Sequence, residues 1–353
     1  MSSYSHILVI NPGSTSTKIA LCNETGLCKT VTMVHSAVEL SQFAGVWGQF
    51  SYRLKLCQEW ISQHVLECAA VVANGGLFRP LEGGVYRVNR QMLDDARTNL
   101  QGEHASNLGC ALAAELARTY SCGAFVVDPV SVDEFEPLAR YSGIPLIARR
   151  SLSHALNIHA AARWAAQESK IQFERSSFII AHLGGGISIA PVRGGKIIDV
   201  NDAASDGPFS PERSGGLPLQ QFISLCYSGR YTDAEVRSLV MGKGGLVAYT
   251  GTNSAEQVEK RIAEGDKNAR EVYQAMAYQV AKEIGAMSTV LKGNVNAIIL
   301  TGGVSRSSML TSWIKERVQF IAPVMMHPGE DEMGALAKAV YRVLNGLEQT
   351  KEY

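Results

Sequence analysis

Polar side chains able to hold a phosphate group are concentrated in one stretch near the start of the chain. The apolar residues 7–10 run directly into Asn11-Pro12-Gly13-Ser14-Thr15-Ser16-Thr17-Lys18. This apolar run predicts a buried strand, and a second run from Ile19 predicts its hairpin partner. The turn between them offers backbone N–H groups, hydroxyls and an amine to a phosphate, with Ser14, Thr15 and Lys18 as candidate ligands. An ordinary polar hairpin has the same composition, so both interpretations stay open for this stretch alone.

Two further glycine turns follow predicted strands later in the chain. They are His182-Leu183-Gly184-Gly185-Gly186 and Thr301-Gly302-Gly303. Glycine lets backbone N–H groups approach phosphate oxygens, although one such turn is weak evidence. The chain has no G-x-x-x-x-G-K-[ST] loop and no G-x-G-x-x-G after a strand, which argues against two familiar nucleotide-binding classes. Three glycine turns in two similar halves predict a nucleotide clasped between domains.

Phosphoryl transfer also needs a metal seat and positive charge on the moving group. Asn11 and Asp128 each end a predicted strand and could hold Mg²⁺ through hard oxygen ligands. Asp128 precedes Pro129, so a local cap is the alternative role. Arg213 lies in the Pro- and Gly-rich loop 207–216 and could contact the phosphoryl group; otherwise it is a surface arginine.

Two histidines and one acidic cluster are weaker candidates. His154 at a predicted helix start and His182 at a strand end could donate to phosphoryl oxygens, but capping or packed histidines are commoner. The acidic residues 330–332 open the last predicted helix, where carboxylates complement the helix dipole. That ordinary role alone would explain the cluster.

The elements that must position these residues alternate between strands and helices. The first half contains predicted strands at 28–34, 69–74 and 123–128 and predicted helices at 50–65, 93–100 and 107–120. This alternation favours an α/β domain with some parallel strands. Ligands bind such sheets at the carboxyl ends of the strands, where Asn11, Asn74 and Asp128 lie.

The second half repeats the plan of the first at an offset of about 171 residues. Its predicted strands are 177–183, 187–192, 196–200 and 295–301, and its predicted helices are 153–167, 233–241, 256–263, 266–291 and 332–347. Two unrelated hairpins are the alternative explanation. We expect two domains, 1–152 for the acceptor and 153–332 for the nucleotide, with helix 333–353 packing back on the first.

Composition narrows the function classes. Lys plus Arg and Asp plus Glu both total 33, so the net charge is zero and a nucleic acid or anionic membrane is not expected as partner. No apolar run reaches membrane-spanning length, and the first residues lack the pattern of a signal peptide. The seven scattered cysteines predict reduced thiols in a cytoplasmic protein, with neither a disulfide framework nor a zinc site.

These motifs together resemble the acetate kinase and butyrate kinase family over nearly the whole chain. The matching runs are residues 11–18, 102–109, 127–130, 154–157, 181–186, 207–213, 242–247, 300–303 and 328–333. Pro12, the run Gly-Glu-His-Ala-Ser-Asn at 102–107 and the run Gly-Pro-Phe-Ser-Pro-Glu-Arg at 207–213 are the versions typical of the butyrate branch.

The resemblance implies the actin-like ATPase fold, in which duplicated α/β domains with mixed sheets surround a central nucleotide cleft. It implies reversible transfer of the ATP γ-phosphoryl group, with Mg²⁺, to a short carboxylate such as butanoate. Asn11 and Asp128 would lie at the metal and phosphoryl site, with a carboxylate of 330–332, such as Glu332, near Mg²⁺. His154 and Arg213 would bind equatorial oxygens.

The resemblance also assigns the remaining ligands. His182 with Gly184, Gly185 and Gly186 would bind the phosphates, Gly302 and Gly303 would lie near the nucleoside, and His104 near the acyl acceptor. The family further suggests a homo-oligomer.

One departure from the family pattern concerns the acceptor. The butyrate branch reads Gly-Arg-Gly-Gly where this chain has Ala73-Asn74-Gly75-Gly76, and an arginine there would clamp a carboxylate. Arg79 is the nearest substitute. The alternatives are therefore a kinase for another short or branched fatty acid and an actin-like nucleotide-binding protein that has lost catalysis.

Overall fold

The computed structural model describes residues 6–65, 67–329 and 331–353, which form two compact units. Unit 1 comprises residues 1–133 with 331–353, and unit 2 comprises residues 134–330. The sequence had placed the boundary after residue 152. Residues 134–152 belong to unit 2 because they bond its sheet: Ile197 N donates to Glu134 Oε2 at 2.7 Å, and Arg149 pairs with Asp199 at 2.9 Å.

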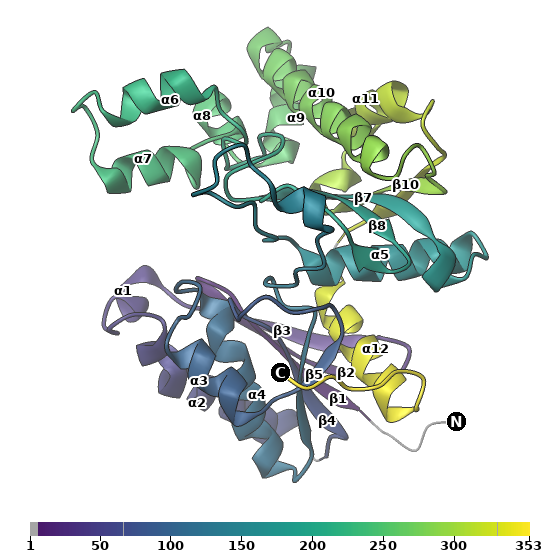
Figure 1. Cartoon of the computed structure of the whole chain (residues 1–353). Helices are drawn as coiled ribbons and strands as arrows, with labels where there is room; N and C mark the ends of the chain where they lie inside the picture. The colour runs from purple at the N-terminus through teal and green to yellow at the C-terminus, as the bar shows by residue number, and fades with distance from the viewer. Residues whose placement is uncertain (1–5, 66, 330) are drawn as a thin grey trace. The chain divides into compact units, whose positions relative to one another are not determined.

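Unit 1 is built on a six-stranded mixed sheet of order β3-β2-β1-β4-β6-β5 (Figure 1). Its strands are β1 Ile7–Pro12, β2 Ser16–Cys22, β3 Cys28–Val34, β4 Ala70–Asn74, β5 Val85–Arg87 and β6 Gly123–Val127. The apolar strands β1, β4 and β6 pair in parallel at the centre, as continuous apolar runs predict. Their carboxyl ends therefore lie along one edge.

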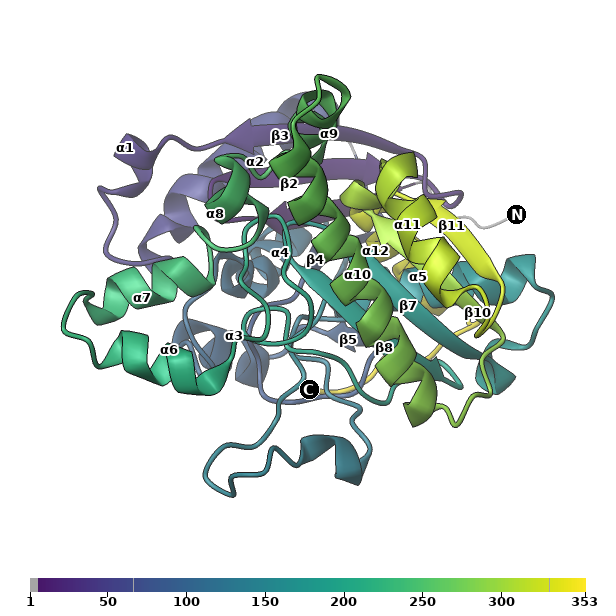
Figure 2. The ribbon, with the colours of Figure 1, turned by 90° about the horizontal axis from the view of Figure 1, so that it is seen from above.

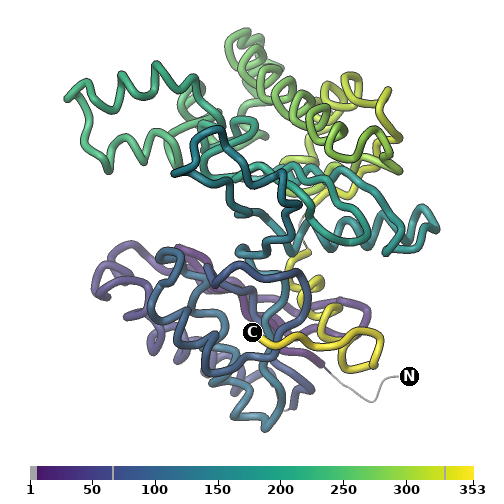
Figure 3. Tube along the Cα trace, in the orientation of Figure 1, coloured from purple at the N-terminus to yellow at the C-terminus, as the bar shows by residue number. Residues whose placement is uncertain are grey.

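Helices cover this sheet, and one of them comes from the far end of the chain. The helices are α1 Ala37–Leu40, α2 Phe50–His64, α3 Arg90–Arg97, α4 Leu108–Thr119 and α12 Glu332–Leu344. Apolar residues of α2 and α4 form a core with β1, β2 and β4. The helix α12 contacts β1, β2, β4, β5 and β6, and the tube in Figure 3 follows the chain from it to the C-terminus beside β5.

Unit 2 contains a five-stranded sheet of order β11-β10-β7-β8-β9. Its strands are β7 Ser177–Leu183, β8 Ile187–Arg193, β9 Lys196–Ile197, β10 Ala297–Gly302 and β11 Val324–Pro328. The helices are α5 Ala155–Glu168, α6 Leu219–Cys226, α7 Asp233–Val240, α8 Leu246–Thr250, α9 Ala255–Ala263, α10 Lys267–Val290 and α11 Ser308–Val318. Within the unit, α10 and α11 lie over one face of the sheet, as Figure 2 shows, and share its larger apolar core.

The two sheets share one topology. In each, three strands form an antiparallel meander, and two later strands add in parallel beside the first: β1-β2-β3 with β4 and β6, and β7-β8-β9 with β10 and β11. The predicted repeat is confirmed at this level. The helix that follows each final strand belongs to the other unit, because α5 follows β6 but lies in unit 2, and α12 follows β11 but lies in unit 1.

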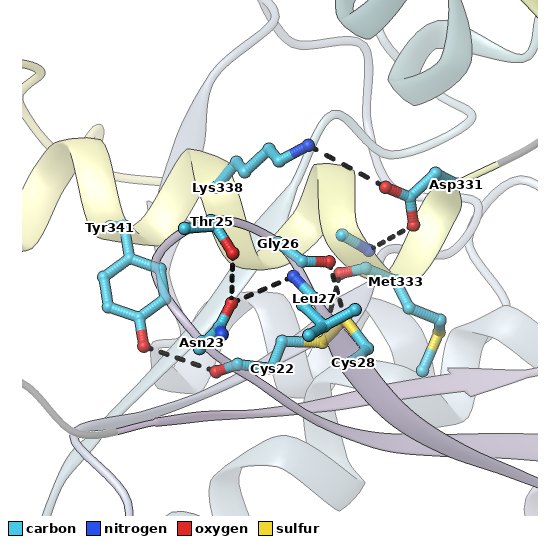
Figure 4. Close-up of a disulfide and its surroundings, with 11 residues drawn as sticks. Cys22, Asn23, Thr25, Gly26, Leu27, Cys28, Asp331, Met333, Lys338 and Tyr341 are labelled. Atoms are coloured by element: carbon cyan, nitrogen blue, oxygen red, sulfur yellow. Dashed lines mark hydrogen bonds and ion pairs between the residues drawn. A yellow bond between two sulfur atoms is a disulfide. The ribbon is translucent and has the colours of Figure 1, made fainter.

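The prediction that all cysteines are reduced thiols differs from the structure, in which Cys22 and Cys28 form a disulfide (Figure 4). The cause is the register of β2 and β3, which pairs these two residues directly across the hairpin. Tyr341 of α12 donates its hydroxyl to the Cys22 carbonyl at 3.3 Å, so the linked turn lies against the C-terminal helix. Among the described residues, no helix combines the length and apolar character needed to cross a membrane.

Candidate active site

Three predicted residues meet at the carboxyl edge of the unit 1 sheet. Asn11 Nδ2 donates to Glu332 Oε2 at 2.7 Å, and Asn74 Nδ2 lies 3.5 Å from Asn11 Oδ1. These residues come from the end of β1, the end of β4 and the first turn of α12. The structure thus assembles amide and carboxylate oxygens from three remote parts of the sequence.

Asp128 follows the neighbouring strand β6 in an unusual backbone conformation. Its φ is +39°, in the left-handed region that non-glycine residues seldom adopt. Asp128 Oδ1 accepts a hydrogen bond from Gly84 N at 2.7 Å, 44 residues away in the sequence, so the carboxylate is bonded to the protein but this bond is not the local cap before Pro129 considered from the sequence. A strained acidic residue at a strand end is nevertheless typical of functional sites.

The turn between β1 and β2 presents its polar groups to solvent. Gly13 N donates to Ser16 O at 2.8 Å, which closes the turn, and Ser14 and Thr15 are exposed. Asn11 and Lys18 are directly paired across the hairpin, so their side chains share one face of the sheet. This face is the one on which Asn11 contacts α12.

The two further acceptor candidates of unit 1, Arg79 and His104, already make hydrogen bonds within the protein. Arg79 pairs with Asp95 at 2.6 Å, and its guanidinium lies over the ring of Tyr353. His104 Nδ1 accepts a hydrogen bond from Ser106 N at 3.2 Å and lies 2.7 Å from the Ser106 hydroxyl. His104 thereby caps the short 3-10 helix Ala105–Asn107. The structure therefore does not bring Arg79 to Asn74 as a replacement cation.

In unit 2, the glycine turn 184–186 is held by the loop that carries Arg213. Gly184 N donates to Gly186 O at 3.1 Å, and Ser210 Oγ donates to Gly185 O at 2.5 Å. A β-carbon on Gly186 would lie 2.3 Å from Arg213 Nη1, so the guanidinium rests directly on this glycine. A side chain at 186 would therefore force the Arg213 guanidinium to move.

Arg213 has hydrogen-bonding capacity left over. Its Nη1 donates to Ala203 O at 2.9 Å, whereas its buried Nε has no hydrogen-bond partner among the described residues. Burial lowers the pKa of this guanidinium, although an arginine remains charged. A half-buried cation with a spare donor is suited to an anionic ligand rather than to the free surface role considered from the sequence.

The two histidines of unit 2 stack on each other beside this turn. The ring centroids of His154 and His182 are 4.3 Å apart, and His154 Nδ1 lies 2.9 Å from Ser188 Oγ. Desolvation first, and then the positive charges that His182 and Arg213 can carry, lower the pKa of His154 well below its ordinary value. His154 is therefore neutral at pH 7, and its side chain makes no helix-capping hydrogen bond.

The third glycine turn lies next to the second. Gly302 ends β10 with a φ of +91°, and a β-carbon there would lie 2.3 Å from Leu183 O at the end of β7. Gly302 and Gly329 also exchange backbone hydrogen bonds. The predicted residues of unit 2 thus gather at one edge of its sheet, as those of unit 1 do at the edge of theirs.

The residues present fit a magnesium ion that is held partly by its substrate. Among the described residues, no group of three or more His, Cys, Asp or Glu could hold a metal alone. Mg²⁺ commonly takes one or two carboxylates together with substrate phosphates and water, and Glu332 and Asp128 with the Asn11 amide match that donor set. Glu330, also considered from the sequence, lies outside the described residues.

Sequence reasoning missed several supporting residues. Ser188 Oγ lies at hydrogen-bonding distance from His154, and Ser210 donates to the carbonyl of Gly185 in the glycine turn. In unit 1, Arg53 of α2 donates to the carbonyl of Gly13 in the turn between β1 and β2. Only Arg53 had a visible signal, because it lies four residues before Cys57 on the apolar face of its predicted helix.

Comparison with known proteins supports these observations. Residues 149–322 match the model of the acetokinase family. The chain is 49% identical over 351 residues to a probable butyrate kinase from Listeria monocytogenes, covering 98% of this chain and 99% of the relative. It is 47% identical over 352 residues to butyrate kinase 2 of Clostridium acetobutylicum, with the same coverage.

Solved structures share the fold at low sequence identity. Acetate kinase from Porphyromonas gingivalis superposes with a TM-score of 0.78 at 16% identity, over 96% of this chain and 99% of that one. A propionate kinase from Francisella tularensis gives 0.76 at 18% identity, over 95% and 98%. The expected actin-like α/β fold with two mixed sheets is confirmed.

Proposed function

Because this chain belongs to the acetokinase family, it is a kinase that phosphorylates a carboxylate with ATP, and we propose that its acceptor is butanoate. The products are butanoyl phosphate and ADP, and the reaction is reversible. The observation that carries the choice of acceptor is near-50% identity over the whole length to relatives named butyrate kinases. Kinases for acetate, propionate or isobutyrate are the alternatives within the class.

The nucleotide is proposed to bind through unit 2. The turn Gly184–Gly186, through the backbone N–H groups of Gly185 and Gly186, and the His182 ring contact its phosphates, and Gly302 and Gly303 lie near the nucleoside. Arg213 and neutral His154 donate to equatorial oxygens of the transferring phosphoryl group. The spare Nε of Arg213 and its position on Gly186 support this assignment.

The acceptor and metal are proposed to bind through unit 1. Asn11, Asp128 and Glu332 hold Mg²⁺ together with substrate phosphates; the ion would neutralise charge on the phosphates when bound. Ser14, Thr15 and Lys18 contact the transferring group. The hydrogen bond between Asn11 and Glu332 and the strained backbone of Asp128 support this assignment.

Such a reaction needs little acid or base catalysis, because the attacking carboxylate is already ionised at neutral pH. The protein contributes position and positive charge instead. Neutral His154 fits this role as a hydrogen-bond donor, since its lowered pKa keeps it from titrating near pH 7.

A coupled assay of ADP release with acetate, propionate, butanoate and isobutyrate tests the proposal. We expect turnover with all the short acids and the highest kcat/KM with butanoate. The second candidate, a nucleotide-binding protein without catalysis, is motivated by Asn74. Nucleotide binding without turnover on any acid would favour it and overturn the kinase proposal.

The acceptor pocket is proposed to include Asn74, His104 and Arg79. Arg79 needs the largest rearrangement of the three, since it must leave Asp95. Asn74→Arg, which restores the family cation, should lower the KM for butanoate by about tenfold through a charged hydrogen bond to the carboxylate. An unchanged KM would remove position 74 from the acceptor pocket.

We propose that the protein self-associates through the α6–α7 face of unit 2. Neither helix contains a buried residue, and the exposed apolar side chains on and near them include Leu217, Leu219, Ile223, Tyr227, Tyr231, Met241 and Tyr249. A hollow of about 760 Å³ lies beside them. Light scattering should report an oligomer that Ile223→Glu dissociates; a monomeric wild type would contradict this.

We also propose a cytoplasmic location, which cell fractionation tests.

A further inference from the structure

Arg53 is a fully buried cation that contacts the phosphate-binding turn of unit 1 from the α2 side. The exposed fraction of its side chain is zero. Its Nη atoms donate to Gly13 O at 2.9 Å, Ser16 O at 3.0 Å, Thr17 Oγ1 at 2.9 Å and Ser14 O at 3.1 Å. Nε and Nη2 donate to Gln49 Oε1 at 3.0 and 2.8 Å. All five N–H groups of the guanidinium are therefore directed at acceptors.

Every one of these acceptors is a neutral oxygen. Within the part of the chain that the structure describes, no carboxylate bonds this guanidinium. Burial lowers the pKa of Arg53, yet an arginine stays protonated in proteins. An unpaired buried charge is costly to keep, so a net positive charge under this turn is a feature that hydrophobic packing alone does not explain.

The carbonyl contacts fix where the amides of the turn point. A peptide bond is planar and trans, so each N–H is opposed to the preceding carbonyl. Because the carbonyls of Gly13 and Ser14 face Arg53, the N–H groups of Ser14 and Thr15 face away from it. Ser14 and Thr15 are exposed. Two successive N–H groups presented to solvent form a small anion-binding concavity.

We propose that Arg53 is a positioning residue for phosphoryl transfer. It orients the amides of Ser14 and Thr15 toward the phosphoryl oxygens and adds fixed positive charge behind them. Arg53 acts through the turn and does not touch the substrate, because the turn covers it. This inference rests on the proposed carboxylate kinase activity.

The neighbouring groups make the turn a connected network. Thr17 Oγ1 lies 2.9 Å from His35 Nε2, and His35 Nδ1 lies 3.2 Å from the hydroxyl of Tyr52. His35 N also donates to Thr15 O at 2.8 Å. A loss of Arg53 should therefore loosen the whole turn, whereas the strands on either side keep their ladder.

The kinetic test compares Arg53→Met, Arg53→Lys and Gln49→Met with the control Ile61→Ala. Ile61 lies two turns further along the same face of α2, is buried in the core and makes no hydrogen bond to the turn. A lysine cannot reach three carbonyls at once, so both Arg53 variants should lose about 10²-fold in kcat through a misplaced turn, with the KM for ATP nearly unchanged. Gln49→Met removes only the support of Arg53 and should cost about fivefold.

Amide exchange gives a second, independent reading. In the wild type and in Ile61→Ala, MgATP should slow exchange of the amides at 14 and 15; in Arg53→Met it should not. Turnover that falls no further in the Arg53 variants than in Ile61→Ala, or equal slowing by MgATP in Arg53→Met, overturns the positioning role. If the wild type phosphorylates no acid but the Arg53-dependent slowing persists, only the kinase assignment fails.

Discussion

The turns 13–15 and 184–186 occupy equivalent places in two sheets of one topology, yet their arginines are used differently. Arg53 directs all five N–H groups at the turn and at Gln49, whereas Arg213 uses Nη1 for Ala203 O and keeps a buried Nε unbonded. An arginine whose N–H groups are all directed at protein acceptors, such as Arg53, holds the surrounding backbone in one conformation. An arginine with an unbonded donor, such as Arg213, retains that donor for a ligand, which is the basis for the phosphoryl-binding role proposed for it.

The largest expected effect tests the arginine with spare donors. Arg213→Ala should lower kcat by about 10³-fold, because a charged donor to the transferring phosphoryl group is lost. The unfolding free energy should change little, since the side chain of Arg213 makes one hydrogen bond to the described residues. Arg237→Ala is the matched control, because Arg237 is exposed and pairs with Asp233 four residues away. Near-normal turnover of Arg213→Ala would break the contrast between the two arginines.

The second prediction compares the glycines that begin or end the two turns. A β-carbon on Gly186 would lie 2.3 Å from Arg213 Nη1, whereas one on Gly13 would lie 3.5 Å from its nearest neighbour, Ser16 O. Gly186→Ala should therefore displace the guanidinium and cost about 10²-fold in kcat, while Gly13→Ala should stay within about threefold. Steady-state kinetics measure kcat for both variants, and an equal loss of kcat in the two would contradict the prediction.

The third prediction concerns pH and two histidines with a lowered pKa, His154 of unit 2 and His35 of unit 1. The pKa of His154 is lowered well below its ordinary value by burial, and that of His35 is lowered to a smaller extent, first by burial and then by Arg53. As the pH falls, these two histidines therefore take up protons at a higher pH in the unfolded chain than in the folded protein. The free energy of unfolding does not depend on these two histidines above about pH 6.5. Below that pH it decreases, by at most about 1.4 kcal/mol per pH unit for each histidine.

Denaturant titrations between pH 4.5 and 7.5 measure this slope. His154→Gln should flatten it more than His35→Gln does, because the shift at His154 is the larger one. A steeper slope after the His154 substitution would mean that the imidazole is charged in the folded protein.

The smallest expected effect concerns the far ends of the two hairpins. In unit 1 the β2–β3 turn is closed by Cys22–Cys28, and in unit 2 the equivalent β8–β9 turn is Gly194-Gly195 in the left-handed region. The glycine pair forms a tight turn without a cross-link. Because Cys22–Cys28 closes only a six-residue separation, replacing both by Ser should leave kcat unchanged and lower the melting temperature by a few degrees. A large loss of activity would link this end of the hairpin to the site.

Sequence patterns predicted the strands better than the connections between them. Long apolar runs such as 70–74 and 177–183 can only be buried, so β4 and β7 were expected nearly to the residue. The helix α6 escaped prediction because it follows Pro218 without a side-chain cap and buries none of its residues. The short β5 depends on tertiary pairing with β6, which no local pattern reveals.

The candidate site was predictable where residue types are distinctive at strand ends. Asn11, Asp128 and His182 were recognised because polar residues rarely end continuous apolar runs. The direct hydrogen bond between Asn11 and Glu332 was not predicted, because it joins residues 321 positions apart, and only the family resemblance placed Glu332 at the same site. The bond between Cys22 and Cys28 was missed because it depends on strand register, which a C-x5-C spacing does not state.

The exchange of the last helix between the units has a consequence for synthesis. Unit 2 is one continuous segment, so a ribosome delivers all of it before residues 331–353 emerge. The segment 1–133 of unit 1 is delivered first but lacks α12, which covers β1 and supplies Glu332 to Asn11, until residues 331–353 have been made. Until α12 is synthesised, the face of the N-terminal sheet that this helix covers lacks it while unit 2 folds. The hydrogen bond between Glu332 and Asn11 can therefore form only after unit 2 has been synthesised, so a chain that stops before residue 331 lacks this contact.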